Sequence, residues 1–166
     1  MSDASWMTPS RMHLVVDARS IRALPTGVGN SVLRQLQGID RLLSETLLAR
    51  KWKISVIRYA HDLRYGPYRH LWEGFSHFHF IDTRIRPTGH PSGDIYQQFR
   101  LPRFVGRIGG DCLYSPAFIG PLRLRRAAHL LMVHDDLVWS QPGSYPLRFR
   151  LYLRAISQVQ AEDVMP

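Results

Sequence analysis

Two apolar runs, far apart in the chain, each lead directly into polar residues. The first is residues 14–16, within a strand predicted over 12–17, and the second is residues 130–133, within a strand predicted over 129–133, directly before His134. A continuous run such as Leu14-Val15-Val16 is typical of a strand that is buried on both faces of a parallel sheet. Because ligands bind beyond the carboxyl ends of parallel strands, the polar residues that follow the two runs are expected to share one site.

Further strands and helices are expected to alternate between these two runs. Strands are predicted at 54–59, 78–82 and 111–115, and a helix at 94–105 that Pro102 limits. Another helix is expected to begin near Asn30 or Ser31, after a loop over 18–28, and a last one to cover 147–160. The first of these helices repeats apolar residues at helical spacing along one face (Val32, Leu36, Ile39 and Leu43, flanked by Leu33 and Leu47). This order predicts an α/β fold, a Rossmann-like and mostly parallel sheet with helices on both faces.

Length and composition are those of one globular domain. The chain has 166 residues, 45% of them hydrophobic, which argues against a disordered protein. We expect a loose N-terminus over 1–11, the domain over 12–160 and a tail over 161–166. Neither a long apolar segment nor a secretory signal is recognisable, and Cys112, the only cysteine, is expected in the core. A cytoplasmic location is the default expectation.

The chain is strongly basic. Its net charge is +9, and Lys51 and Lys53 are its only lysines, so arginine carries almost all of the positive charge. A solvated basic face would be the ordinary explanation. The alternatives are an anionic membrane surface, with the protein peripheral on its inner face, a phosphorylated substrate, and a bias in the base composition of the genome. A nucleic-acid partner is disfavoured because no binding module is recognisable. The arginines form three groups in the sequence: 100, 103 and 107; 123, 125 and 126; and 148, 150 and 154.

The glycines at 27 and 29 indicate a phosphate site rather than a dinucleotide fingerprint. Residues 18–26 separate them from the first strand, whereas the fingerprint needs a tight turn directly after the strand. The start of a helix nevertheless attracts an anion through its free N–H groups. We therefore expect Gly27, Gly29 and Asn30 to face a phosphate, the alternative being a plain chain reversal.

His134 is the main candidate for chemistry. It follows the last apolar run and precedes Asp135 and Asp136, so it is expected at a strand's carboxyl end, where it can contact a sugar hydroxyl or stabilise developing charge. A core histidine is the alternative. His77 and His79 could share a sheet face, but no third ligand accompanies them, so no metal site is predicted.

Taken together, several ordered segments resemble the N-terminal half of the family-four (group 1) retaining glycosyltransferases, which have the two-domain GT-B fold. The matching segments are Val16-Asp-Ala-Arg19, Thr26-Gly-Val-Gly-Asn30, Gly110-Asp-Cys-Leu-Tyr-Ser-Pro116, Val133-His-Asp135, Leu137-Val-Trp139 and Pro142-Gly-Ser-Tyr-Pro146 with the residues up to Leu153. They extend over residues 12–154. One departure is Asp136, since the family usually has His-Asp-Leu.

The resemblance implies an acceptor-binding domain that takes part in the transfer of a hexose from a nucleotide sugar to a cell-surface polysaccharide or glycolipid. It places Gly27 and Gly29 at the donor phosphates, His134 over the transferred sugar, and Asp135, Tyr145 and Arg148 on the acceptor side. The donor-binding domain is expected to be absent from these 166 residues, so that this chain alone would be inactive.

Under this reading the expected partners are the missing domain or a partner chain, and a sugar or lipid-linked acceptor. No cofactor is expected in this chain. A nucleotide sugar is the expected donor substrate if the second domain is supplied. The alternatives are a non-catalytic sugar- or lipid-binding module and, more remotely, a fragment of an NADP-binding oxidoreductase.

Overall fold

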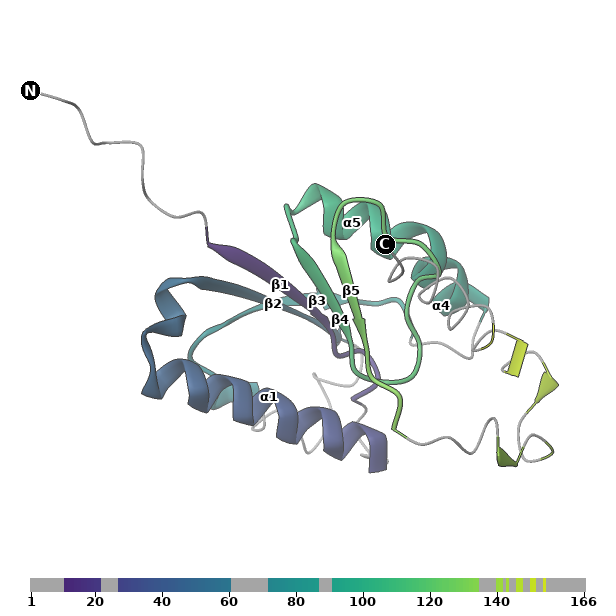
Figure 1. Cartoon of the computed structure of the whole chain (residues 1–166), viewed down its shortest axis with the longest axis horizontal. Coiled ribbons are helices and arrows are strands. Elements are labelled where there is room, and N and C mark those ends of the chain that lie inside the picture. The colour runs from purple at the N-terminus through teal and green to yellow at the C-terminus, as the bar shows by residue number, and fades with distance from the viewer. Residues whose placement is uncertain are drawn as a thin grey trace, which may run out of the picture.

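A five-stranded parallel sheet forms the centre of the protein (Figure 1). The computed structural model describes residues 11–21, 27–60, 72–86 and 91–134, and single positions between 140 and 154. The strands are β1 (Met12–Asp17), β2 (Trp52–Tyr59), β3 (Phe78–Thr83), β4 (Cys112–Ser115) and β5 (Ala128–Leu131). Their order is β3-β2-β1-β4-β5, and every neighbouring pair is parallel. The predicted Rossmann-like sheet is therefore confirmed.

Helix α1 (Gly27–Glu45) covers one face of the sheet. Its apolar stripe, with Val32, Leu33, Leu36 and Leu43 buried, packs against Val16 of β1 together with Ile54 and Val56 of β2. The helix begins at Gly27, about one turn earlier than predicted, so Gly27, Gly29 and Asn30 lie in its first turn and not in a loop before it. The prediction for Leu47 was wrong. This residue lies in a short 3-10 helix, η1 (Leu47–Arg50), and is 72% exposed.

The opposite face is covered by a helical segment in three parts. These are α4 (Pro91–Ile95), the π-helical turn η2 (Tyr96–Arg100) and α5 (Leu101–Arg107). Leu101 and Val105 pack against Val15 of β1 and Leu113 of β4. Because successive residues of a strand point to opposite faces, Val16 packs on the side of α1 and Val15 packs on the side of α5. Helices on both faces are thus confirmed (Figure 1).

Pro102 accounts for the π-helical turn. A proline has no N–H to donate to the carbonyl four residues before it, and its ring would collide with that carbonyl. The backbone widens by one residue, and Leu101 N–H donates to the carbonyl of Tyr96, five residues earlier. The predicted helix over 94–105 therefore exists, but it extends from 91 to 107 and Pro102 does not end it.

Several smaller expectations also changed. The fifth strand covers Ala128–Leu131 and not 129–133. Cys112 is half-buried at the start of β4 and is not a fully buried core residue. Of the predicted helix over 147–160 the structure describes only residues 147, 150, 151 and 154, which are helical, and the tail and almost all of the N-terminal segment lie outside the described residues. In the part of the chain that the structure describes, no helix is long and apolar enough to cross a membrane.

Candidate functional site

The carboxyl ends of β1 and β4 define the candidate site. β2 and β3 follow β1 on one side of it, whereas β4 and β5 lie on the other side, so the connections diverge between β1 and β4. In an open parallel sheet a ligand-binding crevice forms at such a switch point. Asp17 is the last residue of β1 and Arg19 follows it, while Ser115 is the last residue of β4 and Pro116 follows it.

Asp17 and Arg19 form a buried ion pair at this point. Arg19 Nε donates to Asp17 Oδ1 at 2.7 Å, and Arg19 Nη2 donates to Asp17 Oδ2 at 2.7 Å. The guanidinium also donates to the side-chain oxygen of Gln97 and lies 4.5 Å from the ring centre of Tyr96. Gln97 and Tyr96 belong to the π-helical turn, so this cluster ties the end of β1 to the helical layer.

Burial sets the electrostatics of this cluster. Burial disfavours the charged guanidinium, but the carboxylate of Asp17 holds the pKa of Arg19 above its ordinary value. Burial also raises the pKa of Tyr96. The exposed fraction is 2% for Arg19, 8% for Asp17 and 1% for Gln97, so the cluster at the end of β1 is closed to solvent. It positions neighbouring residues and does not itself offer a surface to a ligand.

The first turns of α1 border a shallow hollow. Gly27 and Asn30, two of the three residues predicted to face a phosphate, line it with Ser31, Arg34 and Gln35. Its volume is about 540 Å³. Gly29, the third predicted residue, is buried. Arg34 was not predicted, although its position one turn after Asn30 places it on the same side of the helix.

Gln35 connects this hollow to the carboxyl ends of β4 and β5. Its side-chain oxygen accepts a short hydrogen bond from the hydroxyl of Tyr114, and its Nε2 lies 3.0 Å from Met132 Sδ. Burial raises the pKa of Tyr114, which keeps the hydroxyl in its donating form. Met132 directly follows β5 and is two residues from His134. The predicted phosphate residues and the predicted histidine therefore belong to one edge of the sheet.

His134 is held by the segment that follows β4. Its Nε2 lies 2.7 Å from the carbonyl oxygen of Pro116, and its ring centre is 5.0 Å from that of Phe118. A carbonyl only accepts, so Nε2 carries the proton, and in the neutral ring Nδ1 is the acceptor. In the described part of the chain, Nδ1 has no hydrogen-bond partner.

The loop against His134 has a special backbone. Phe118 has a φ of 62°, a left-handed conformation that is unusual for a bulky residue. Its N–H donates to the carbonyl of Met132 at 3.1 Å, and Met132 N–H donates to the carbonyl of Ser115 at 3.0 Å. These bonds extend the pairing of β4 with β5 past the strand ends, so they fix the backbone just before the histidine and the loop that its ring contacts.

Three predicted site residues, Asp135, Tyr145 and Arg148, lie outside the described residues. Two groups were missed as site residues. The Asp17-x-Arg19 pattern at a strand end was a usable signal for a buried ion pair. Nothing in the sequence pointed to Gln35 or Gln97, because their partners come from distant segments.

Within the described ranges, no three His, Cys, Asp or Glu side chains gather to hold a metal ion. His77 instead contacts Asp40, with its Nδ1 3.2 Å from Asp40 Oδ1, and His79 is exposed. No family model, curated protein or solved structure matches the chain.

Proposed function

We propose that this chain is the acceptor-binding domain of a glycosyltransferase that moves a hexose from a nucleotide sugar to a polysaccharide or glycolipid acceptor. The observation that carries the proposal is the Gln35 link, which joins the hollow at the start of α1 to the segment that contains His134. A diphosphate and the sugar attached to it would need polar groups on two neighbouring segments, and this link supports placing both at one edge of the sheet.

The first turn of α1 would receive the donor's phosphates. Gly27 and Asn30 are exposed there, and the free N–H groups of a helix start favour an anion. Arg34 lines the same hollow and adds a guanidinium, which pairs well with phosphate oxygens. Negative charge grows on the leaving diphosphate during transfer, so these groups would stabilise the transition state more than the bound donor.

His134 would contact the transferred sugar. Since Nε2 donates to the Pro116 carbonyl, Nδ1 is the atom that can interact with a sugar hydroxyl. The packing against Phe118 restrains the ring, which lowers the entropic cost of this contact. Asp135, Tyr145 and Arg148 would lie on the acceptor side. The remaining donor contacts would come from a second domain or a partner chain.

A second candidate is a non-catalytic sugar- or lipid-binding module with the same fold. The hydrogen bond from His134 to a backbone carbonyl favours this alternative, because a purely structural histidine is held in the same way. Removal of the His134 imidazole should lower turnover under the first candidate and lower stability under the second.

The test uses His134→Ala in an enzyme reconstituted with a donor-binding domain. We expect turnover to fall at least about tenfold with little change in melting temperature, because a transition-state contact is lost. His79→Ala, an exposed histidine on β3, is the matched control and should leave turnover unchanged. A large drop in melting temperature with normal turnover would assign His134 a structural role and favour the second candidate.

A further inference from the structure

The π-helical turn has a second consequence, away from the candidate site. It brings Gln97 and Gln98 against the segment that follows β4. Gln98 Nε2 donates to the Gly120 carbonyl at 3.3 Å, and its Oε1 accepts from Leu122 N–H at 2.9 Å. Gln97 Nε2 donates to the Ile119 carbonyl at 3.4 Å. Residues 119–122 are therefore fixed to the helical layer.

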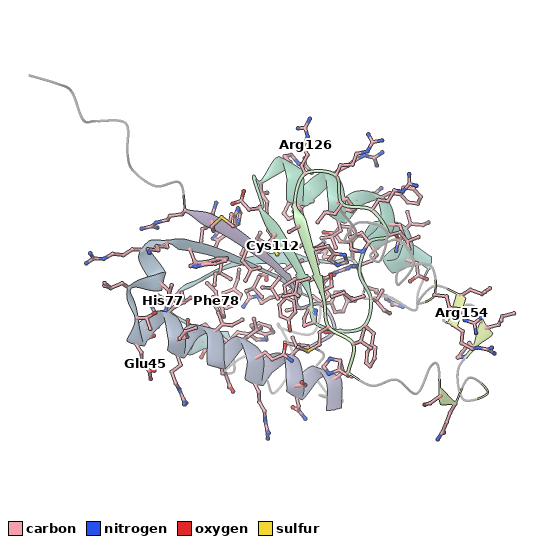
Figure 2. The ribbon with its side chains drawn as sticks, in the orientation of Figure 1. Glu45, His77, Phe78, Cys112, Arg126 and Arg154 are labelled. Carbon is pink, nitrogen blue, oxygen red and sulfur yellow. The ribbon has the colours of Figure 1, made fainter. Side chains whose placement is uncertain are left out.

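This attachment determines where the next residues lie. Leu124 and Ala127 pack against the core cluster beneath α5, so the chain continues along the helix as it approaches β5. Arg123, Arg125 and Arg126 are exposed, and in Figure 2 Arg126 projects outward beside α5. The second of the three arginine groups in the sequence thus lies beside two members of the first, on α5.

Together these elements form an open groove of about 710 Å³. Five arginines line it, Arg103 and Arg107 from α5 and Arg123, Arg125 and Arg126 from the segment before β5. The other lining residues are Gln98, Phe99, Pro102 and Gly106, so no carboxylate is among them.

The positive charge of the groove is uncompensated. Among the residues that the structure describes, none of the five arginines takes part in an ion pair. Five like charges in one concavity repel one another, and an anion that fills the groove would relieve this repulsion. Arginine presents paired N–H donors that match two oxygens of one phosphate, which lysine cannot do.

The groove is separate from the candidate site. Arg123, Arg125 and Arg126 precede the amino end of β5, whereas His134 follows its carboxyl end. A ligand in the groove would therefore not compete with one at the start of α1.

We infer that this groove is a second binding site, for a small molecule that carries several phosphate groups. A flat bilayer would touch only the rims of a concave surface, whereas a compact oligophosphate can reach guanidinium groups on both walls. Phe99, which is 58% exposed, adds an aromatic surface for an apolar or ring-shaped part of such a ligand. The inference does not depend on the proposed glycosyltransferase function.

Isothermal titration with inorganic tripolyphosphate tests this inference. We expect saturable binding with one dominant site, and this binding should weaken as salt is raised because the charges are close to solvent. The double variant Arg123→Ala/Arg126→Ala should weaken binding at least about tenfold, while Arg41→Ala/Arg84→Ala should change it less than about twofold. The control removes the same charge from exposed positions outside the groove. Melting temperatures of both variants check folding.

Three results would overturn the inference. Equal weakening in both variants would mean that only net charge matters. Affinity for tripolyphosphate no greater than for sulfate would mean that the groove does not recognise linked phosphates. Binding to phosphatidylglycerol vesicles that depends on Arg123 and Arg126, without tripolyphosphate binding, would make this face a membrane contact. Vesicle binding that tripolyphosphate displaces would support the site and identify lipid headgroups as one source of its ligand.

Discussion

Arg19 donates two hydrogen bonds of 2.7 Å to the carboxylate of Asp17, two residues earlier in the chain, and both side chains are buried. Asp17 ends the central strand β1, and Arg19 reaches the π-helical turn through Gln97. The pair therefore sets the direction in which the chain leaves the sheet on its way to α1. It links the carboxyl end of β1 to the helical layer on one face of the sheet.

Breaking this pair should be costly. Arg19→Met leaves the Asp17 carboxylate buried without its partner, and such a change typically costs about 3–5 kcal/mol. Urea denaturation measures the free energy of unfolding. Arg19→Met/Asp17→Asn should recover part of the loss because the unpaired charge is gone. A loss of less than about 1 kcal/mol in the single variant would show that water reaches the carboxylate and that the Asp17–Arg19 pair is not closed to solvent.

Two glycines should respond in opposite directions to alanine. A Cβ at Gly110 would lie 2.8 Å from both Val105 Cγ1 and Val15 Cγ2, so Gly110→Ala should destabilise the fold by about 1–3 kcal/mol through overpacking. A Cβ at Gly38, within α1, would meet nothing within 4 Å. Gly38→Ala should stabilise the helix by about 0.5–1 kcal/mol. Thermal melts of both variants check the pair, and equal melting temperatures would contradict the packing between α5 and the sheet.

Stability should fall as the solution becomes acidic. Burial lowers the pKa of His129 from 6.5 to about 4. Between these values the unfolded chain binds a proton that the folded chain does not, so lowering the pH favours unfolding, by up to roughly 3 kcal/mol over this window. The lowered pKa of His13, which arises first from burial, acts in the same direction.

His129→Gln isolates the contribution of His129. Denaturation at pH 7 and at pH 4.5 should show a smaller acid-induced loss in this variant than in the wild-type protein. His79→Gln should behave like the wild type, because His79 is exposed on β3. The same loss in all three proteins would mean that His129 is not protected from protonation.

The 166 residues should fold but bind a nucleotide sugar only weakly. The hollow at α1 and His134 offer groups on one side of the donor, so the dissociation constant should be on the order of millimolar or weaker. Titration with uridine and guanosine diphosphate sugars, with a product-release assay alongside, measures this. Micromolar binding or clear turnover would show that this domain carries the donor site itself.

Local patterns in the sequence were sufficient to predict the strands of the sheet and the helix that covers one of its faces. The apolar run of β1 and the helical spacing of Val32, Leu36 and Leu43 depend on burial alone, and burial follows from residue type. Element ends were less certain. Gly27 has little helical preference of its own, so the sequence placed the start of α1 about one turn too late. Pro102 was expected to limit the helix because it cannot donate a backbone hydrogen bond. The sequence does not show that a π-helical turn allows the helix to continue without this bond.

The sequence by itself determined an α/β chain, its parallel sheet, its excess of arginine and the position of His134 just beyond a strand. Only the tertiary structure decided which distant residues meet. Gln35 reaches Met132, Gln97 reaches Arg19, and Arg103 comes to share a groove with Arg126. Such contacts depend on the order of the strands in the sheet and on the exact turn of each helix. Neither leaves a periodic trace in the sequence, because a polar side chain that pairs with a distant partner resembles any other polar residue until both have been placed.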